Sequence, residues 1–181
     1  MLSILIFSGC QENTSDPTSV SNDDGSLSKG GKVIDNVTGS GNFVSNGNLR
    51  VFTFNARSFA DGSVDGHFNL NRTNSGVHIS GSITCFNING NEAYFGGIIE
   101  NSNSSNPNFG PGASSWFAVM DNGQGNNSDP DQISLSLNSN DPFYDQTFLE
   151  QFCADPSTVA PLDNPISYGW NDVESGNIKI H

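Results

Sequence analysis

The feature that most constrains this chain is an alternation of apolar and polar residues that recurs from one segment to the next. In LRVFTFNAR (49–57), Phe52 and Phe54 fall on one face of an extended chain and Thr53 on the other. A period of two residues predicts a strand with one buried face. The same kind of pattern predicts further strands at 37–44, 63–72, 76–88, 91–101, 113–122, 131–137 and 176–181, of which the first is the weakest.

Two of these segments depart from simple alternation. Segment 91–101, NEAYFGGIIEN, is apolar on both faces, which predicts a central strand. Segment 76–88 alternates through Ile79 and Ile83 and then changes face near Cys85, which predicts a bulge or a twist.

The connections between the predicted strands carry turn residues. Asp-Gly at 61–62, Asn-Ser-Gly at 74–76 and Asn-Gly-Asn at 89–91 are hairpin signals. No segment has a sustained helical period, and the best candidate, TFLEQFCA (147–154), allows one or two turns at most. We therefore predict an all-β fold, an antiparallel meander of about eight strands. It closes into a barrel-like form or a strongly twisted sandwich, because closure removes exposed strand edges.

Charge and composition narrow the possible partners. The chain has 181 residues, six Lys plus Arg, nineteen Asp plus Glu and a net charge of -13. This balance argues against binding to nucleic acid or to anionic lipid headgroups, both of which need a cationic surface. Apolar residues are only 34% of the chain, so they must be concentrated in one part of it.

The first thirty-two residues differ from the rest. Residues 11–31 hold one valine and one leucine, which predicts a flexible polar tether. The domain prediction is a signal-peptide remnant at 1–9, a tether at 10–32 and a single β domain at 33–181.

The stretch Phe7-Ser8-Gly9-Cys10 resembles the lipobox of bacterial lipoproteins. In that family the Cys becomes the new N-terminus and is acylated, so the resemblance implies lipidation at Cys10. Phe7 departs from the usual Leu, and the basic residues that normally precede the apolar stretch are missing. Gln11 follows the Cys, which by resemblance favours the outer membrane over inner-membrane retention. The alternatives are a secreted protein or an incidental apolar N-terminus with an unmodified Cys.

Segments from 37 to 181 also resemble a small β domain of exported bacterial proteins, often placed at their C-terminal ends. The resemblance rests on the order VFTFNAR, DGSVDGHFNL, HISGSITCFNINGNEAYFGG, FAVMDNGQG and the final SGNIKIH. It implies a fold and export, and no catalytic residues. This chain departs by the insertion at 101–115 and by the Cys-bearing segment 139–172.

With Cys10 assigned to lipid, Cys85 and Cys153 remain. An even pair in an exported protein predicts a disulfide, which would hold the segment before the last strand onto the sheet. The alternative is two buried free thiols.

The loop VMDNGQGNNSDPDQIS (119–134) is the candidate metal site. Asp121, Asp129 and Asp131 could supply oxygen ligands to calcium, although the spacing is not that of an EF-hand. Clusters of Asp, Asn and Gly more often mark a hairpin loop. No other cofactor is predicted.

Other polar residues carry weaker expectations. His67 and His78 fall on neighbouring strands and could face each other as a solvated pair. Arg50, Arg57 and Arg72 are the only basic residues between 33 and 178, and we expect surface ion pairs rather than an anion site.

Three functions compete. The favoured one is a lipid-anchored surface module with a binding or structural role, no catalysis and a possible protein or glycan partner. The second is a barrel that carries a small apolar ligand among its aromatic strands. The third, a glycan-acting hydrolase, would need a carboxylate pair in a cleft.

Overall fold

The computed structural model describes residues 31–123 and 128–181. Within these residues, six long strands come first: β1 (Val33–Ser45), β2 (Asn48–Phe59), β3 (Val64–Arg72), β4 (Val77–Asn89), β5 (Glu92–Ser102) and β6 (Ser114–Met120). Shorter strands follow: β7 (Gln132–Ile133), β8 (Leu137–Ser139), β9 (Asn171–Asp172) and β10 (Ser175–Ile180).

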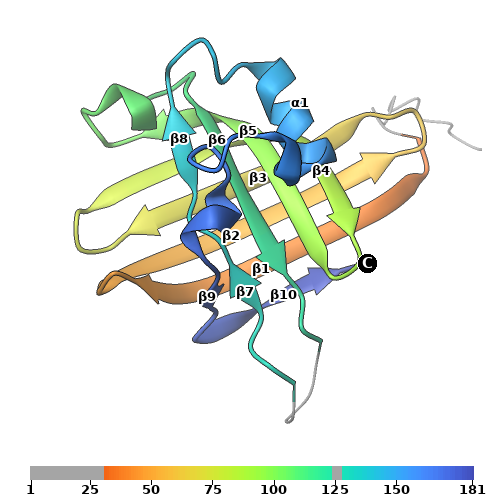
Figure 1. Cartoon of the computed structure of the whole chain (residues 1–181), viewed down its shortest axis with the longest axis horizontal. Coiled ribbons are helices and arrows are strands. Elements are labelled where there is room, and N and C mark those ends of the chain that lie inside the picture. Colours follow the sequence, from red (N-terminus) through yellow and green to blue (C-terminus); the bar gives the residue numbers. More distant parts are fainter. Residues whose placement is uncertain (1–30, 124–127) are drawn as a thin grey trace, which may run out of the picture.

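All of these strands belong to one antiparallel sheet. The order is β10-β1-β2-β3-β4-β5-β6-β7-β9, and β8 pairs with the start of β6. The first six strands follow one another as a meander, and the sheet curls into a half-barrel with its last strand beside its first (Figure 1). The predicted all-β, barrel-like meander is confirmed.

The interior of the half-barrel is packed with phenylalanine rings. Phe54 and Phe68 reach across from β2 and β3 to Phe117 of β6, with ring centroids 5.7 and 6.3 Å apart. Phe95 of β5 stacks on the same ring at 5.0 Å. Phe54 lies over Gly39 of β1, where a Cβ atom would overlap the ring. The side chains of the sheet therefore fill the space that its curvature encloses.

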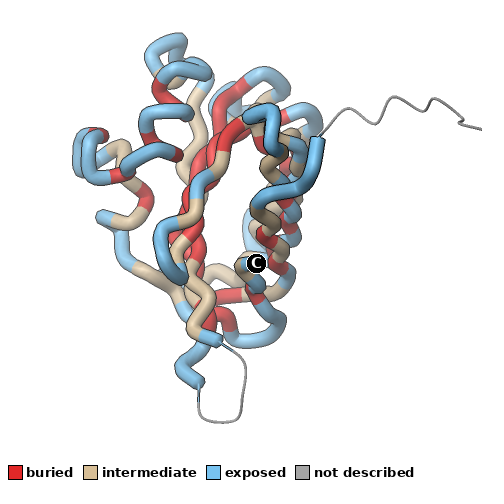
Figure 2. Tube along the Cα trace, turned by 90° about the vertical axis from the view of Figure 1, so that its right-hand side faces the viewer, coloured by how far each residue is buried: buried red, intermediate tan, exposed pale blue. Residues whose placement is uncertain are grey.

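A second layer covers the outer face of β4, β5 and β6. Helix α1 (Gln146–Ala154) contributes Leu149 and Phe152 to a separate buried cluster. The ring centroids of Phe148 and of Trp116 in β6 are 5.1 Å apart. Two short 3₁₀ turns belong to this layer, η2 (Pro156–Thr158) and η3 (Pro165–Tyr168). A third, η1 (Pro107–Phe109), precedes β6 and packs Phe109 against the interior cluster. In Figure 2 exposed residues gather in the turns and in this outer layer, and buried ones follow the strands. β5 and β6 are thus buried on both faces, as predicted for 91–101.

The change of face predicted near Cys85 is confirmed. The β4–β5 register shifts between Ile83 and Cys85. Ile83 packs in the interior cluster, whereas Cys85 packs with α1 on the outside. One irregularity lets a single strand serve both layers.

Two expectations about strands need correction. The weak segment 37–44 forms part of β1, which is 13 residues long. Segment 131–137 is not one strand: it is divided into β7 and β8, because the Ser134 hydroxyl takes the backbone N–H of Ala118 that a ladder would use. A turn at Asn46-Gly47, with φ of 51° and 72°, was not among the predicted hairpin signals.

The best helix candidate, 147–154, is found as α1, whose nine residues slightly exceed the one or two turns expected. It begins where the Asp145 carboxylate accepts the N–H of Phe148 at 3.1 Å. Within residues 31–123 and 128–181, no helix is long and apolar enough to cross a bilayer.

Candidate functional site

The predicted lipidation site, Cys10, lies outside the described residues, as does the tether up to residue 30. Lipidation therefore stays a prediction.

Cys85 and Cys153 form the predicted disulfide. Their Cα atoms are 6.2 Å apart and the two residues are separated by 68 positions in the sequence. Both are buried, Cys85 on β4 and Cys153 near the end of α1. The bond ties the outer layer to the sheet at the point where β4 changes face.

Two of the three predicted calcium ligands have a different role. Asp121 follows β6 and Asp131 precedes β7, and both carboxylates reach β10. The Asp131 Oδ2 accepts the backbone N–H of Ile178 at 2.7 Å, and the Asp121 Oδ2 accepts that of Ile180 at 3.0 Å. We call this pair of contacts the aspartate seam.

The second oxygen of each seam carboxylate is also engaged. The Asp131 Oδ1 accepts the N–H of Asn122 at 3.0 Å, and the Asp121 Oδ1 accepts that of Gly123 at 2.8 Å. Asp129 is exposed. Among the residues that the structure describes, no group of three His, Cys, Asp or Glu side chains is placed to hold a metal ion. Calcium binding at Asp121, Asp129 and Asp131 stays a prediction, and it would compete with backbone partners.

The two histidines do not face each other. In the β3–β4 register His67 pairs with Ser82 and His78 pairs with Asn71. Both histidines are exposed. The expected histidine pair is therefore wrong.

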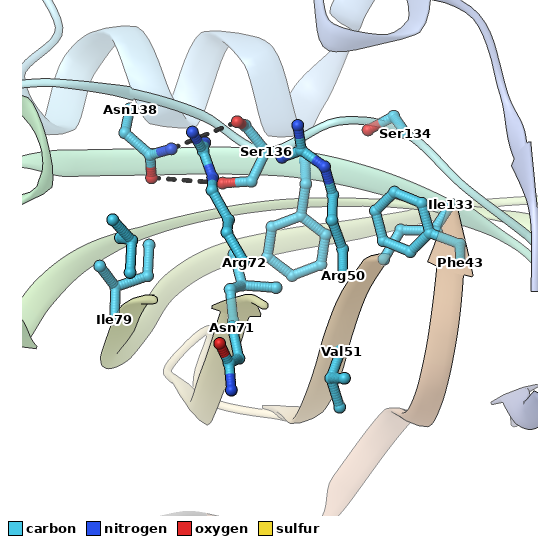
Figure 3. Close-up of a pocket in the computed structure, with 13 residues that line it drawn as sticks. Phe43, Arg50, Val51, Asn71, Arg72, Ile79, Ile133, Ser134, Ser136 and Asn138 are labelled. Atoms are coloured by element: carbon cyan, nitrogen blue, oxygen red, sulfur yellow. Dashed lines mark hydrogen bonds between the residues drawn. The ribbon is translucent and has the colours of Figure 1, made fainter. Parts of the chain in front are cut away.

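The half-barrel instead brings two arginines together at its mouth. Arg50 of β2 and Arg72 of β3 are cross-strand partners. Arg50 shares the inward phase of Phe52, and Arg72 shares that of Phe68, so both side chains point inward. Figure 3 shows them side by side, reaching toward the segment between β7 and β8. The expected surface ion pairs are wrong for these two residues, because the strand period turns them away from the outer surface.

The pocket around the arginines has apolar walls and one polar rim. The apolar lining is Phe43, Val51, Leu70, Val77, Ile79, Phe117 and Ile133. Ser134, Ser136 and Asn138 form the rim opposite the guanidinium groups (Figure 3). The pocket encloses about 400 Å³ of atom-free space, part of which is open to solvent. Most of this space is too narrow for a water molecule, whose centre can move through only about 20 Å³ of it. It is therefore a narrow slot rather than a chamber.

No ion-pair partner of either arginine is found among the described residues. The Arg50 Nε is buried and has no hydrogen-bond partner there. The Arg72 guanidinium carbon lies 4.4 Å from the centroid of the Phe109 ring, which η1 supplies. The Arg72 head is thus held against an aromatic ring, and neither guanidinium has a neutralising charge among the residues that the structure describes.

Burial and the adjacent charge change the acidity of these groups. Burial, and then the positive charge of Arg50, lower the pKa of Arg72 to about 10. Burial also lowers the pKa of Arg50. At neutral pH Arg72 is still protonated, so like charges face each other across the β2–β3 pair.

This concentration of positive charge stands out because the chain carries a net charge of -13. Two of its six Lys and Arg residues share one slot. Both arginines are half-buried, and an anion is the group that would offset this partial loss of hydration. The two-residue alternation along β2 and β3 was a sequence signal for this site. Arg50 and Arg72 fall on the same face of their strands as the predicted core positions.

Comparisons of the chain with protein-family models, with curated proteins and with solved structures found no match. The two resemblances noted above stay predictions, and function must be argued from this chain's own residues.

Proposed function

We propose that this chain is a non-catalytic binding module of the bacterial cell envelope, anchored by a lipid on Cys10, and that the slot of Arg50 and Arg72 binds an anion. The observation that carries the binding role is the pair of inward-facing arginines without an ion-pair partner among the described residues. An anion in the slot would replace the repulsion between the two guanidinium groups with two charge-assisted contacts.

The anchoring part rests on separate observations. Ser8, Gly9 and Cys10 fit a lipobox, and residues 11–31 fit a tether that would hold the β domain away from the membrane. The disulfide supports export, because such bonds persist mainly in oxidising compartments. Outer-membrane placement follows from Gln11 and stays part of the proposal.

Two experiments test these parts independently. For the anchor, the full chain is expressed in a Gram-negative host and the intact mass of the membrane-extracted protein is measured. We expect cleavage before Cys10 and a lipid adduct, both absent in a Cys10→Ser variant. An unmodified mass in the membrane fraction would remove the lipoprotein assignment.

For binding, thermal unfolding of the full chain is followed in sodium acetate and sodium sulfate, against sodium chloride at matched ionic strength. We expect a rise in Tm in at least one of the two salts, because a ligand of the folded state stabilises it. The rise should be smaller in an Arg50→Met/Arg72→Met double variant, which keeps only the general stabilising effect of the salt, and should be unchanged in Arg57→Met. Arg57 is the matched control, since it lies on the same strand but is exposed.

The apolar-carrier alternative meets a filled interior. Phe54, Phe95 and Phe117 occupy the centre of the half-barrel, with ring centroids 5.0 to 5.7 Å apart. A ligand of lipid size would have to displace these rings. The anion-binding proposal needs no such rearrangement of the core.

A further inference from the structure

We infer that the anion bound in the slot is a carboxylate carried by a short apolar group. This inference rests on the proposed function, because it names the ligand class of the same site. It follows from the hydrogen-bond donors that the slot offers, from the nature of its walls and from its width.

The donors offered by the slot are mainly the two guanidinium groups, because the hydroxyls of the rim already have partners. The Ser134 hydroxyl donates to the Leu135 carbonyl at 3.1 Å. The Ser136 hydroxyl donates to the Asn138 Oδ1 at 3.2 Å. A carboxylate has two oxygens, and the forked donors of arginine match its planar geometry. Sulfate or phosphate would place its further oxygens against rim groups that already donate within the protein.

The walls favour an apolar portion next to the charge. Leu70 and Val77 line the slot and are only half-buried, so part of their apolar surface is open to water. An inorganic anion would leave this surface facing water. A methyl or methylene group attached to the carboxylate would cover it, at a gain of about fourfold in affinity for each buried methylene.

The width of the slot limits that apolar portion. The space open to a water centre, about 20 Å³, corresponds to one or two water molecules. Below it the phenyl rings are in contact with one another. We therefore expect affinity to rise over the first one or two methylenes and to gain nothing from longer chains.

The test is calorimetric titration of the full chain with acetate, butyrate, octanoate, butyramide and sulfate. We expect butyrate to bind more tightly than acetate by about fourfold per added methylene that enters the slot. Octanoate should gain no more than butyrate, and uncharged butyramide should not bind. Sulfate should bind at least tenfold more weakly than butyrate, since its further oxygens find no donors.

The outcomes separate the inference from the proposed function. Sulfate binding as tightly as butyrate overturns the carboxylate inference and leaves the anion-binding proposal standing. Butyramide binding as tightly as butyrate overturns both, because an uncharged ligand would then suffice. Absence of binding by every anion in the series, sulfate included, overturns the proposed function itself.

A conservative variant tests the role of the guanidinium fork. Arg50→Lys keeps the charge but loses the forked donors, so butyrate affinity should fall about tenfold. Arg57→Lys is the matched control and should leave the affinity unchanged. Equal butyrate affinity in Arg50→Lys and the parent protein would show that charge alone suffices, and would overturn recognition of the carboxylate by shape.

The same chemistry could reach the slot as a free acid or as the end of a peptide. Acetyl-glycyl-leucine and its C-terminal amide distinguish the two sources. Binding of the peptide acid but not the amide assigns a chain terminus, and binding of butyrate alone assigns a small free acid. Both results support the carboxylate, whereas equal binding of peptide acid and amide contradicts it.

Discussion

Arg50 and Arg72 lower the free energy of unfolding of the protein without a bound anion, and single substitutions can measure this effect. Like charges directly opposite each other on paired strands are destabilising, and the buried Arg50 Nε has no partner among the described residues. We therefore predict that Arg50→Met raises the free energy of unfolding by about 1 kcal/mol, because Met keeps the apolar stem and removes the charge.

Chemical denaturation in a chloride buffer without carboxylates measures this effect. Arg57→Met should stay within about 0.5 kcal/mol of the parent, as exposed substitutions usually do. A loss of stability in Arg50→Met would mean that packing of the guanidinium head outweighs the repulsion.

Tyr144 gives a prediction at alkaline pH. Its hydroxyl donates to the Asp163 Oδ1 at 2.7 Å, and this bond, followed by burial, raises the pKa of Tyr144 to about 12. The ordinary value is 10, so the unfolded chain releases the proton first. Stability from this group is complete below about pH 10 and is lost as the pH rises toward 12.

Denaturation of the parent and of Tyr144→Phe across that interval tests the sign. We expect the parent to lose more stability between pH 10 and 12 than the variant does. Ultraviolet absorbance of the phenolate should show one fewer late-titrating tyrosine in the variant. Parallel pH profiles would contradict the bond to Asp163.

At the scale of elements, sequence patterns predict the long strands better than the short ones. The period of two residues predicts β2 to β6, and the change of face near Cys85 predicts the bulge in β4, because both depend on which side chains are apolar. The division of 131–137 depends on one hydroxyl, Ser134, that takes the place of a ladder partner. No periodicity reports such a contact.

The candidate site could also be predicted only in part, because alternation gives the face of each arginine but not its neighbours. The parity that places Phe52 inside also places Arg50 inside, but a charged residue at such a position suggests the surface when it is considered alone. That Arg50 faces Arg72 depends on the β2–β3 register, which the turn at 61–62 sets. The apolar wall opposite comes from β6 and β7, and only the curl of the sheet brings it near.

The disulfide belongs to this scale because it joins two elements. In the chain-entropy model a bond closing a loop of 68 positions stabilises by about 4 kcal/mol. We predict a loss of that order in a Cys85→Ala/Cys153→Ala variant, measured by denaturation. A Cys10→Ser variant should lose nothing, and an equal loss there would contradict the pairing.

At the scale of the whole molecule, the aspartate seam joins β10, at one end of the strand order, to the residues that follow β6 and precede β7. Asp131→Asn replaces one accepting oxygen with a donor that faces a backbone N–H, at a cost of about 1–3 kcal/mol. Asp129→Asn, on the same loop but exposed, is the matched control and should stay within about 0.5 kcal/mol. Equal effects of the two substitutions would show that the seam contributes little.

Calcium tests the same loop. Because all four carboxylate oxygens of Asp121 and Asp131 accept backbone N–H groups, we expect millimolar calcium to leave Tm unchanged. A clear rise in Tm that Asp129→Asn abolishes would instead establish the predicted metal site.

The seam also bears on how copies of this protein meet. β10 lies at one end of the strand order, where an outer row of N–H groups is a template for a strand from another molecule. The carboxylates of Asp121 and Asp131 occupy that row at Ile180 and Ile178. They cover two positions at which a strand from another molecule would otherwise pair, so the side chains that complete the seam also protect this edge.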